Sequence, residues 1–235
     1  MSVSELQHLA DCRLCGRLAG YLDTLPPARG RGRAEYWNRP VAGFGDRQAR
    51  IWLLGLAPGA HGANRTGRPF TGDGAGDFMY PLLHQAGLAS QPAATALGDG
   101  LALRDLYISN AVKCAPPENK PAAAEFACCR PYLAMEQAML DRLRVVVALG
   151  RGAYDSYLRL CREQGIIQRA ADYPFAHGAR YRLSNGLWLV ACYHTSRYNV
   201  QTGRMTTVMF LELLEAVKAL ATGASSAEAA PCQHF

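Results

Sequence analysis

Short apolar runs that alternate with helix-like segments are the feature that most constrains how this chain folds. The runs lie at Ile51–Leu56, Leu106–Ser109, Val145–Leu149 and Leu187–Cys192. Each run is bounded by glycine, proline or polar residues, a pattern typical of buried strands. Strands that alternate with helices predict an α/β domain in which a mostly parallel sheet is covered by helices on both sides.

The segments between these runs carry apolar residues at helical spacing. Pro131 lies inside one of them and is expected to kink or divide that helix, and Asn119 is a possible cap near its start. Residues 184–186, Ser-Asn-Gly, separate Tyr181–Leu183 from the last apolar run, which predicts a hairpin. The expected helices are Glu5–Leu22, Asp77–Leu88, Pro121–Leu143, Ala153–Gln164 and Met205–Leu220.

Length and composition favour a single domain. The chain has 235 residues, of which 49% are hydrophobic, enough to bury a proper core. We expect one domain over residues 1–220 and a tail at 221–235 whose small residues give no reason to order. No apolar run approaches the ~18 residues of a membrane span. The first residues lack the basic and apolar regions of a signal peptide, which predicts a cytoplasmic protein.

Polar segments follow three of the apolar runs at their carboxyl ends. These segments are residues 57–73, Asn110–Cys114 and His194–Asn199. A parallel sheet brings such ends to one edge, where ligands bind in open α/β folds, so the segments are predicted to line one cleft. The first is rich in glycine and carries two arginines, which suits an anionic ligand such as phosphate. A net charge of +6 is likewise compatible with a polyanionic partner.

Four cysteines form the second pattern of note. Cys12 and Cys15 make a C-x2-C pair, and Cys114 and Cys129 form a second, more widely spaced pair, with Cys129 inside the long expected helix. Because a cytoplasmic compartment is reducing, these thiols indicate a metal or iron–sulfur centre rather than disulfides, with zinc as the alternative metal. Cys128 competes with Cys129, since a helix presents only one of two adjacent residues to a given site. Cys161 and Cys192 are expected to be buried small residues, and Cys232 lies in the tail.

Four separated segments resemble the uracil-DNA glycosylase superfamily, and specifically its family five. They are GLAPGAHGANRTGRPFTGD, SNAVKCAPP, CRPYL and HTSRYNVQTG, and the resemblance runs from Cys12 to about Leu220. It implies an α/β fold with a central parallel four-stranded sheet and a 4Fe–4S cluster on Cys12, Cys15, Cys114 and Cys129. It also implies a monofunctional, monomeric enzyme of base excision repair that hydrolyses N-glycosyl bonds. The implied substrates are uracil and related bases such as hypoxanthine and hydroxymethyluracil, excised from double-stranded DNA.

The catalytic residues that this resemblance favours are Asp73, His194 and Asn110. The Asn110 amide complements O4 and N3–H of uracil, whereas cytosine would leave buried polar groups unpaired at ~1–3 kcal/mol each. His194 would donate a hydrogen bond to O2 of the departing base, a type of stabilisation worth ~3–4 kcal/mol. Asp73 would orient water or offset positive charge on the sugar. Each also has a purely structural interpretation: Asn110 as a turn residue, His194 as a core histidine and Asp73 as a turn carboxylate.

The remaining site residues would hold the base and the DNA. Phe70 would stack on a base extruded from the duplex, or else simply pack in the core. A large loop residue must fill the gap that the base leaves, and Arg197, Tyr198 and Asn199 are the candidates. Gly55, Ala57, His61 and Asn64 are further base-pocket residues, and Arg65, Thr66, Arg68 and Ser196 are further DNA contacts.

Three competing functions draw on the same residues. A family-four enzyme strict for uracil would have a glutamate after the first strand, where this chain has Ala57-Pro58-Gly59. A non-catalytic nucleic-acid-binding module built on a four-cysteine site would leave the convergence of Phe70, Asn110 and His194 unused. A nucleotide-binding redox protein is excluded because no G-x-G-x-x-G or Walker pattern follows the first strand.

Overall fold

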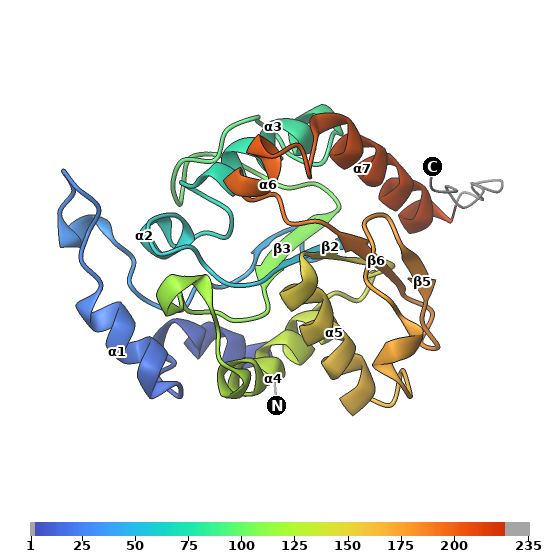
Figure 1. The fold of residues 1–235 in the computed structure, drawn as a ribbon, viewed down its shortest axis with the longest axis horizontal. Coiled ribbons are helices and arrows are strands. Elements are labelled where there is room, and N and C mark those ends of the chain that lie inside the picture. Colours follow the sequence, from blue (N-terminus) through green and yellow to red (C-terminus); the bar gives the residue numbers. More distant parts are fainter. Residues whose placement is uncertain (1–2, 224–235) are drawn as a thin grey trace.

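A sheet of parallel central strands organises the computed structural model, which describes residues 3–223 (Figure 1). Within these residues the strand order is β1-β3-β2-β4-β6-β5, with β1 and β5 antiparallel to their neighbours and the central four strands parallel. The expected α/β class and the four parallel central strands are confirmed, and a short antiparallel strand lies at each edge of the sheet. The strands are β1 (Phe44–Gly45), β2 (Ile51–Gly55), β3 (Leu106–Asn110), β4 (Val145–Leu149), β5 (Arg180–Arg182) and β6 (Trp188–Cys192).

The predicted hairpin is present as the antiparallel pair of β5 and β6. The sequence did not indicate β1, because two residues are too short to show any alternation. The central strands β2, β3 and β4 are buried along their whole length, as expected for parallel strands covered on both faces.

Helices cover both faces of this sheet (Figure 1). Alternate strand residues divide between the two sides: Leu53 joins the core beneath α3 (Gly74–Gln85) and α7 (Thr207–Thr222), and Trp52 joins the core beneath α4 (Ala123–Met139) and α5 (Arg151–Glu163). Shorter segments complete the chain: η1 (Val3–Asp11), η2 (Arg33–Glu35), α2 (Ala63–Thr66), η3 (Pro117–Asn119), η4 (Ala170–Asp172) and α6 (Arg197–Gln201).

The prediction of one continuous helix over Glu5–Leu22 is wrong. A 3-10 helix, η1, ends at Asp11, and α1 (Gly16–Thr24) begins only after the C-x2-C segment. Cys15 precedes α1 with an extended backbone, which breaks the helix between the two elements. In one continuous helix Leu14 would lie on the same face as Leu18, yet Leu14 is 72% exposed and Leu18 is fully buried. The apolar spacing across residues 5–22 therefore belongs to two elements and not to one.

Three further expectations about helices differ from the structure. Helix α4 runs across Pro131 without being divided, and its start is capped by Glu125, which accepts the Ala122 backbone N–H at 2.7 Å, rather than by Asn119. The predicted tail overlaps α7, which ends at Thr222 with Gly223 in the left-handed conformation. Residues 224–235, including Cys232, lie outside the described part. Among the described residues, no helix has both the length and the apolar character needed to cross a bilayer.

Candidate active site

One cleft lies at the carboxyl edge of the sheet, where the three predicted polar segments meet. It encloses about 720 Å³, within the range of roughly 300–1,000 Å³ usual for small-ligand sites. The register that pairs Gly55 of β2 with Asn110 of β3 places the two segments that follow these strands side by side. The residues predicted for the site that line this cleft are Ala57, His61, Phe70, Asp73, Asn110, His194, Ser196 and Arg197.

Phe70 is held in an unusual conformation at the inner end of the cleft. Its φ is +52°, in the left-handed region that bulky residues rarely adopt, and its side chain is buried. Two glycines make room for it. A Cβ on Gly76 would lie 1.8 Å from the Phe70 carbonyl oxygen, and one on Gly55 would lie 2.5 Å from its Cζ. Strain of this kind, fixed by surrounding structure, is characteristic of functional sites.

Asn110 ends strand β3 and is 2% exposed. A Cβ on Gly55 would lie 2.3 Å from its Oδ1, so Gly55 also leaves the space that the amide occupies. Within residues 3–223 the Asn110 side chain has no hydrogen-bond partner, although neighbouring buried amides such as that of Asn64 do. A nearly buried amide that lines a cleft and lacks a protein partner is suited to bind the edge of a ligand.

Asp73 performs a structural task and still faces the cleft. Its Oδ1 accepts the backbone N–H groups of Ala75 and Gly76, each at 3.1 Å, and so caps α3. Its Oδ2 lies against two glycines: a Cβ would be 3.1 Å away on Gly59 and 2.3 Å away on Gly62. The sequence left two roles open for Asp73, a turn residue or a cleft residue. The structure combines them, because one carboxylate oxygen caps α3 and the other lies at the cleft.

His194 follows β6 on the other wall. Its ring lies 6.2 Å from that of Phe70, centroid to centroid, with an interplanar angle of 32°. Burial lowers the pKa of His194, and the nearby Asp73 carboxylate only partly opposes that shift. The imidazole is therefore neutral at pH 7, with one ring N–H to donate and one nitrogen to accept. Gly150, with φ +86°, packs against its Cβ.

Three residues predicted to contact the base or DNA are used inside the protein instead. Asn64 is fully buried and donates to Asn38 Oδ1 and to the Ala60 carbonyl, which shapes the loop. Arg68 is 2% exposed, and its guanidinium binds Asp99 at 2.8 and 2.6 Å. The Thr66 hydroxyl lies 3.1 Å from the Thr71 carbonyl. Because the polar groups of Asn64, Thr66 and Arg68 are bonded within the protein, we do not propose these residues as contacts to the base or to DNA.

The outer rim of the cleft comes from residues 194–199 and the start of α2. Ser196 caps α6 by accepting the Asn199 backbone N–H, and the Asn199 amide donates to the His194 carbonyl at 2.8 Å. These bonds fix the turn on which Arg197 and Tyr198 stand exposed, Tyr198 by 71%. His61 Nδ1 lies 2.9 Å from the Tyr36 hydroxyl, and Arg65 Nε donates to the His61 carbonyl.

Asn119 was missed as a site residue by the sequence analysis. Expected to cap a helix, it instead lines the cleft opposite the glycine-rich loop. It and Glu118 both have left-handed backbones, with φ +57° and +54°. Asparagine tolerates this conformation better than most residues, so the Pro-Pro-Glu-Asn turn carried a signal for unusual backbone but none for its position in the fold.

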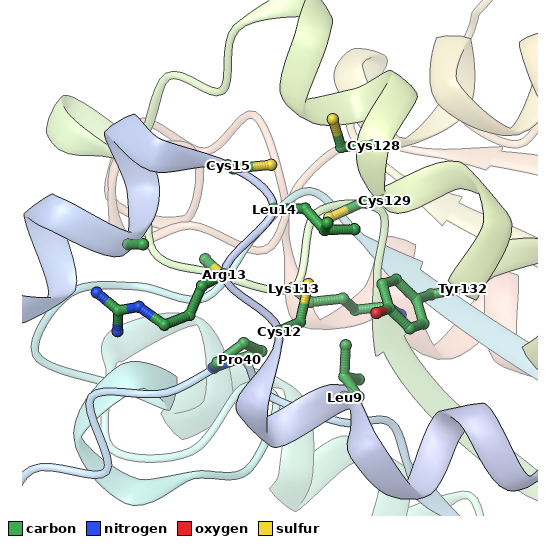
Figure 2. A pocket seen from close by; sticks show the side chains of 12 residues that line it. Leu9, Cys12, Arg13, Leu14, Cys15, Pro40, Lys113, Cys128, Cys129 and Tyr132 are labelled. Atoms are coloured by element: carbon green, nitrogen blue, oxygen red, sulfur yellow. The ribbon is translucent and has the colours of Figure 1, made fainter.

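A second pocket gathers the cysteines on the α4 side of the molecule. It is lined by both residues of the C-x2-C pair together with Cys114, Cys128 and Cys129, and Figure 2 shows the Cys15 and Cys129 side chains turned toward each other. Burial together with the neighbouring thiols raises the pKa of Cys114 to about 12, and the thiols that act on it are Cys129, Cys12 and Cys15. Cys128 is not among these neighbours and is less buried than Cys129.

The donor chemistry of this pocket fits a thiolate-bound cluster. Buried thiols with raised pKa values stay protonated unless a cation compensates their charge, and iron supplies such a cation. Among the described residues, no group of three or more His, Cys, Asp or Glu side chains is gathered closely enough for a single metal ion. A four-iron cluster takes one thiolate at each iron, and five cysteines line this pocket.

The fold and cleft define a protein class that comparison with known sequences makes explicit. The family model described as the uracil DNA glycosylase superfamily matches residues 42–218. This range contains β1 to β6 and every segment of the cleft. The chain belongs to the uracil DNA glycosylase superfamily.

Full-length relatives narrow this assignment to the type-5 branch. The type-5 uracil-DNA glycosylase of Thermus thermophilus is 51% identical over 217 residues, which cover 92% of this chain and 96% of that protein. The type-5 enzyme of Pyrobaculum aerophilum is 40% identical over 89% of this chain and 88% of its own length. A type-4 enzyme from Thermotoga maritima matches only 50% of this chain and 54% of its own length, at 34% identity.

Proposed function

We propose that this protein excises uracil from DNA by hydrolysing the N-glycosidic bond, the first step of base excision repair. The observation that carries the proposal is the convergence in one cleft of Phe70 and Asp73 from the loop after β2, Asn110 from the end of β3 and His194 from the segment after β6. The cleft supports it because its volume of about 720 Å³ has room for a base turned out of the duplex, as this chemistry requires.

Base recognition is assigned to Asn110 and Phe70. The free Asn110 amide has a donor for O4 and an acceptor for N3–H of uracil, whereas cytosine presents the reverse pattern. The Phe70 ring stacks on the base, with its position fixed by Gly55 and Gly76. The cavity does not discriminate by shape alone, because its polar groups must be paired by the incoming base.

Bond cleavage is assigned to His194 and Asp73. As the bond breaks, negative charge grows on the base and positive charge on the sugar. The neutral His194 donates to O2 of the leaving base, and the Asp73 carboxylate, through the oxygen that does not cap α3, orients water or stabilises the sugar cation. The absence of an acidic side chain at Ala57-Pro58-Gly59 leaves Asp73 as the carboxylate of the cleft.

The finer properties are part of the same proposal. Uracil is accompanied by hypoxanthine and hydroxymethyluracil as substrates, the DNA is double-stranded, and the enzyme is a cytoplasmic monomer. Exposed Arg197 and Tyr198 are suited to fill the gap in the duplex, and Arg65 to contact phosphate. A 4Fe–4S cluster would be held by Cys12, Cys15, Cys114 and Cys129, where it would tie the N-terminal segment to α4 and take no part in hydrolysis.

A cleavage assay on labelled duplexes tests the proposal. Protein purified without oxygen is incubated with duplexes carrying one uracil, one hypoxanthine or only thymine, and alkali then cuts any abasic site. We expect cleavage at uracil and hypoxanthine and not at thymine. Asp73→Asn and His194→Ala are expected to lower the single-turnover rate by about 100-fold or more.

Three outcomes would count against parts of this assignment. Cleavage at uracil alone would refute the broad substrate range. Near wild-type rates in both variants would refute the roles of Asp73 and His194. Folded protein that binds the duplexes but cleaves none of them would leave a non-catalytic DNA-binding module as the better account.

A further inference from the structure

A basic groove runs along helix α5, outside the cleft that holds the proposed chemistry. Its first part encloses about 530 Å³ between α5, Arg130 of α4 and the start of η4. A second hollow of about 370 Å³ continues it and shares Arg151, Asp155, Leu158 and Ala170 as walls. Because the two hollows share these walls, they form one continuous groove, which we name the α5 groove.

The charge of the α5 groove is positive. Four arginines line it, against the two carboxylates Asp155 and Glu163. Each carboxylate is already paired, Asp155 with Arg151 at 2.8 Å and Glu163 with Arg130 at 2.5 Å. Within residues 3–223, Arg159 and Arg162 have neither an ion pair nor a side-chain hydrogen bond. Two exposed guanidinium groups thus remain for an anionic ligand.

The second hollow of the α5 groove has an apolar wall. Tyr173, Pro174 and Phe175 line the second hollow. Tyr154 fixes the position of this wall. Its ring packs against Phe175 with centroids 5.3 Å apart, and its hydroxyl donates to the Tyr173 carbonyl. Guanidinium groups in the first hollow, followed by rings in the second, suit a ligand that combines phosphates with apolar sugar or base surfaces.

The α5 groove begins next to the cleft. Arg151, the first residue of α5, directly follows Gly150, and a Cβ on Gly150 would lie 3.2 Å from His194 Cβ. The aromatic wall also leads to the cleft, because Phe175 packs 6.1 Å from Tyr193, the residue before His194. Helix α5 has 13 residues, so the groove follows about 20 Å of surface away from His194.

Resting on the proposed excision of uracil from DNA, we propose that the α5 groove binds the phosphate backbone that flanks the damaged nucleotide. A length of ~20 Å corresponds to about six nucleotides at 3.4 Å each along one strand. Arg159 and Arg162 contact phosphates, and the Tyr173–Phe175 wall packs against sugars. The groove therefore adds affinity for duplex beyond the cleft and leaves the hydrolytic step unchanged.

Binding measurements on two duplex lengths test this proposal. Both probes carry one 2′-fluorinated deoxyuridine, which resists cleavage; the long one has twelve base pairs on each side and the short one four. The full-length R159Q/R162Q double variant removes only exposed, unpaired charges. The matched control, R104Q/R142Q, removes two exposed charges just before β3 and β4, at the opposite edge of the sheet.

For the long probe we expect R159Q/R162Q to weaken binding about tenfold at low salt. The slope of log K against log salt should fall by about 1.8, because two phosphate contacts are lost at ~0.9 each. The short probe and the single-turnover rate at saturating enzyme should not change. Equal affinity of R159Q/R162Q and the control for the long probe would overturn the proposal, as would an equal loss on both probes. Failure of uracil cleavage itself would be visible separately in the rate.

Discussion

At the scale of single residues, the base pocket depends on Gly55 having no side chain. Gly55 stands at the end of β2, where a Cβ would lie 2.3 Å from Asn110 Oδ1 and 2.5 Å from Phe70 Cζ. We expect Gly55→Ala to lower the single-turnover rate on uracil at least 100-fold, since both base-contacting groups must move, while the fold survives. Gly20→Ala in α1, where nothing lies within 4 Å, is the control and should keep the wild-type rate, with an equal or slightly higher melting temperature because alanine favours a helix interior. Equal rates for the two variants would contradict this view of the pocket.

At the scale of elements, the glycine-rich loop is held by a buried ion pair. Arg68 binds Asp99, and the Asp99 carboxylate also accepts the Thr95 and Leu101 backbone N–H groups at 2.8 and 3.0 Å, which keeps its pKa well below the usual range. Asp99→Asn leaves the buried guanidinium uncompensated and should lower the free energy of unfolding in urea by about 3–5 kcal/mol. Glu215→Gln, which breaks the exposed pair with Lys218, should change it by less than about 1 kcal/mol. A similarly small effect of both substitutions would show that the loop is held by other contacts.

At the scale of the whole molecule, the cysteine pocket joins chain segments that are far apart in sequence. The C-x2-C segment, the end of the β3 segment and α4 meet there, and Leu18 and Leu22 of α1 pack against Val112 beside it. If a cluster occupies this pocket, Cys129→Ser should abolish the visible absorbance, lower bound iron and sulfide, and reduce the melting temperature. Cys161→Ser, in the core beneath α4 and α5, should leave the visible absorbance and the bound iron and sulfide unchanged. Cys128→Ser separates the two candidates for the fourth ligand, and full loss of iron in that variant alone would reassign it.

The sequence by itself determined the class of fold and the location of the cleft. The apolar runs are strands because only β-branched and other apolar residues suit positions buried on both faces, and parallel strands bring their following segments to one edge. For the same reason Asn110 and His194, which follow different strands, line one cleft as the sequence predicts. The motifs of residues 55–73 and 194–199 pointed to the family that the comparisons then established.

Only the tertiary structure decided which polar residues face the cleft. Arg65 and Arg68 differ little in sequence context, yet Arg68 is buried because Asp99, from a loop 31 residues away, supplies its partner. The break between η1 and α1, the position of Asn119 in the cleft and the double role of Asp73 also depend on distant contacts. Local propensity reports what a segment prefers alone, whereas burial and pairing are set by what the rest of the chain places beside it.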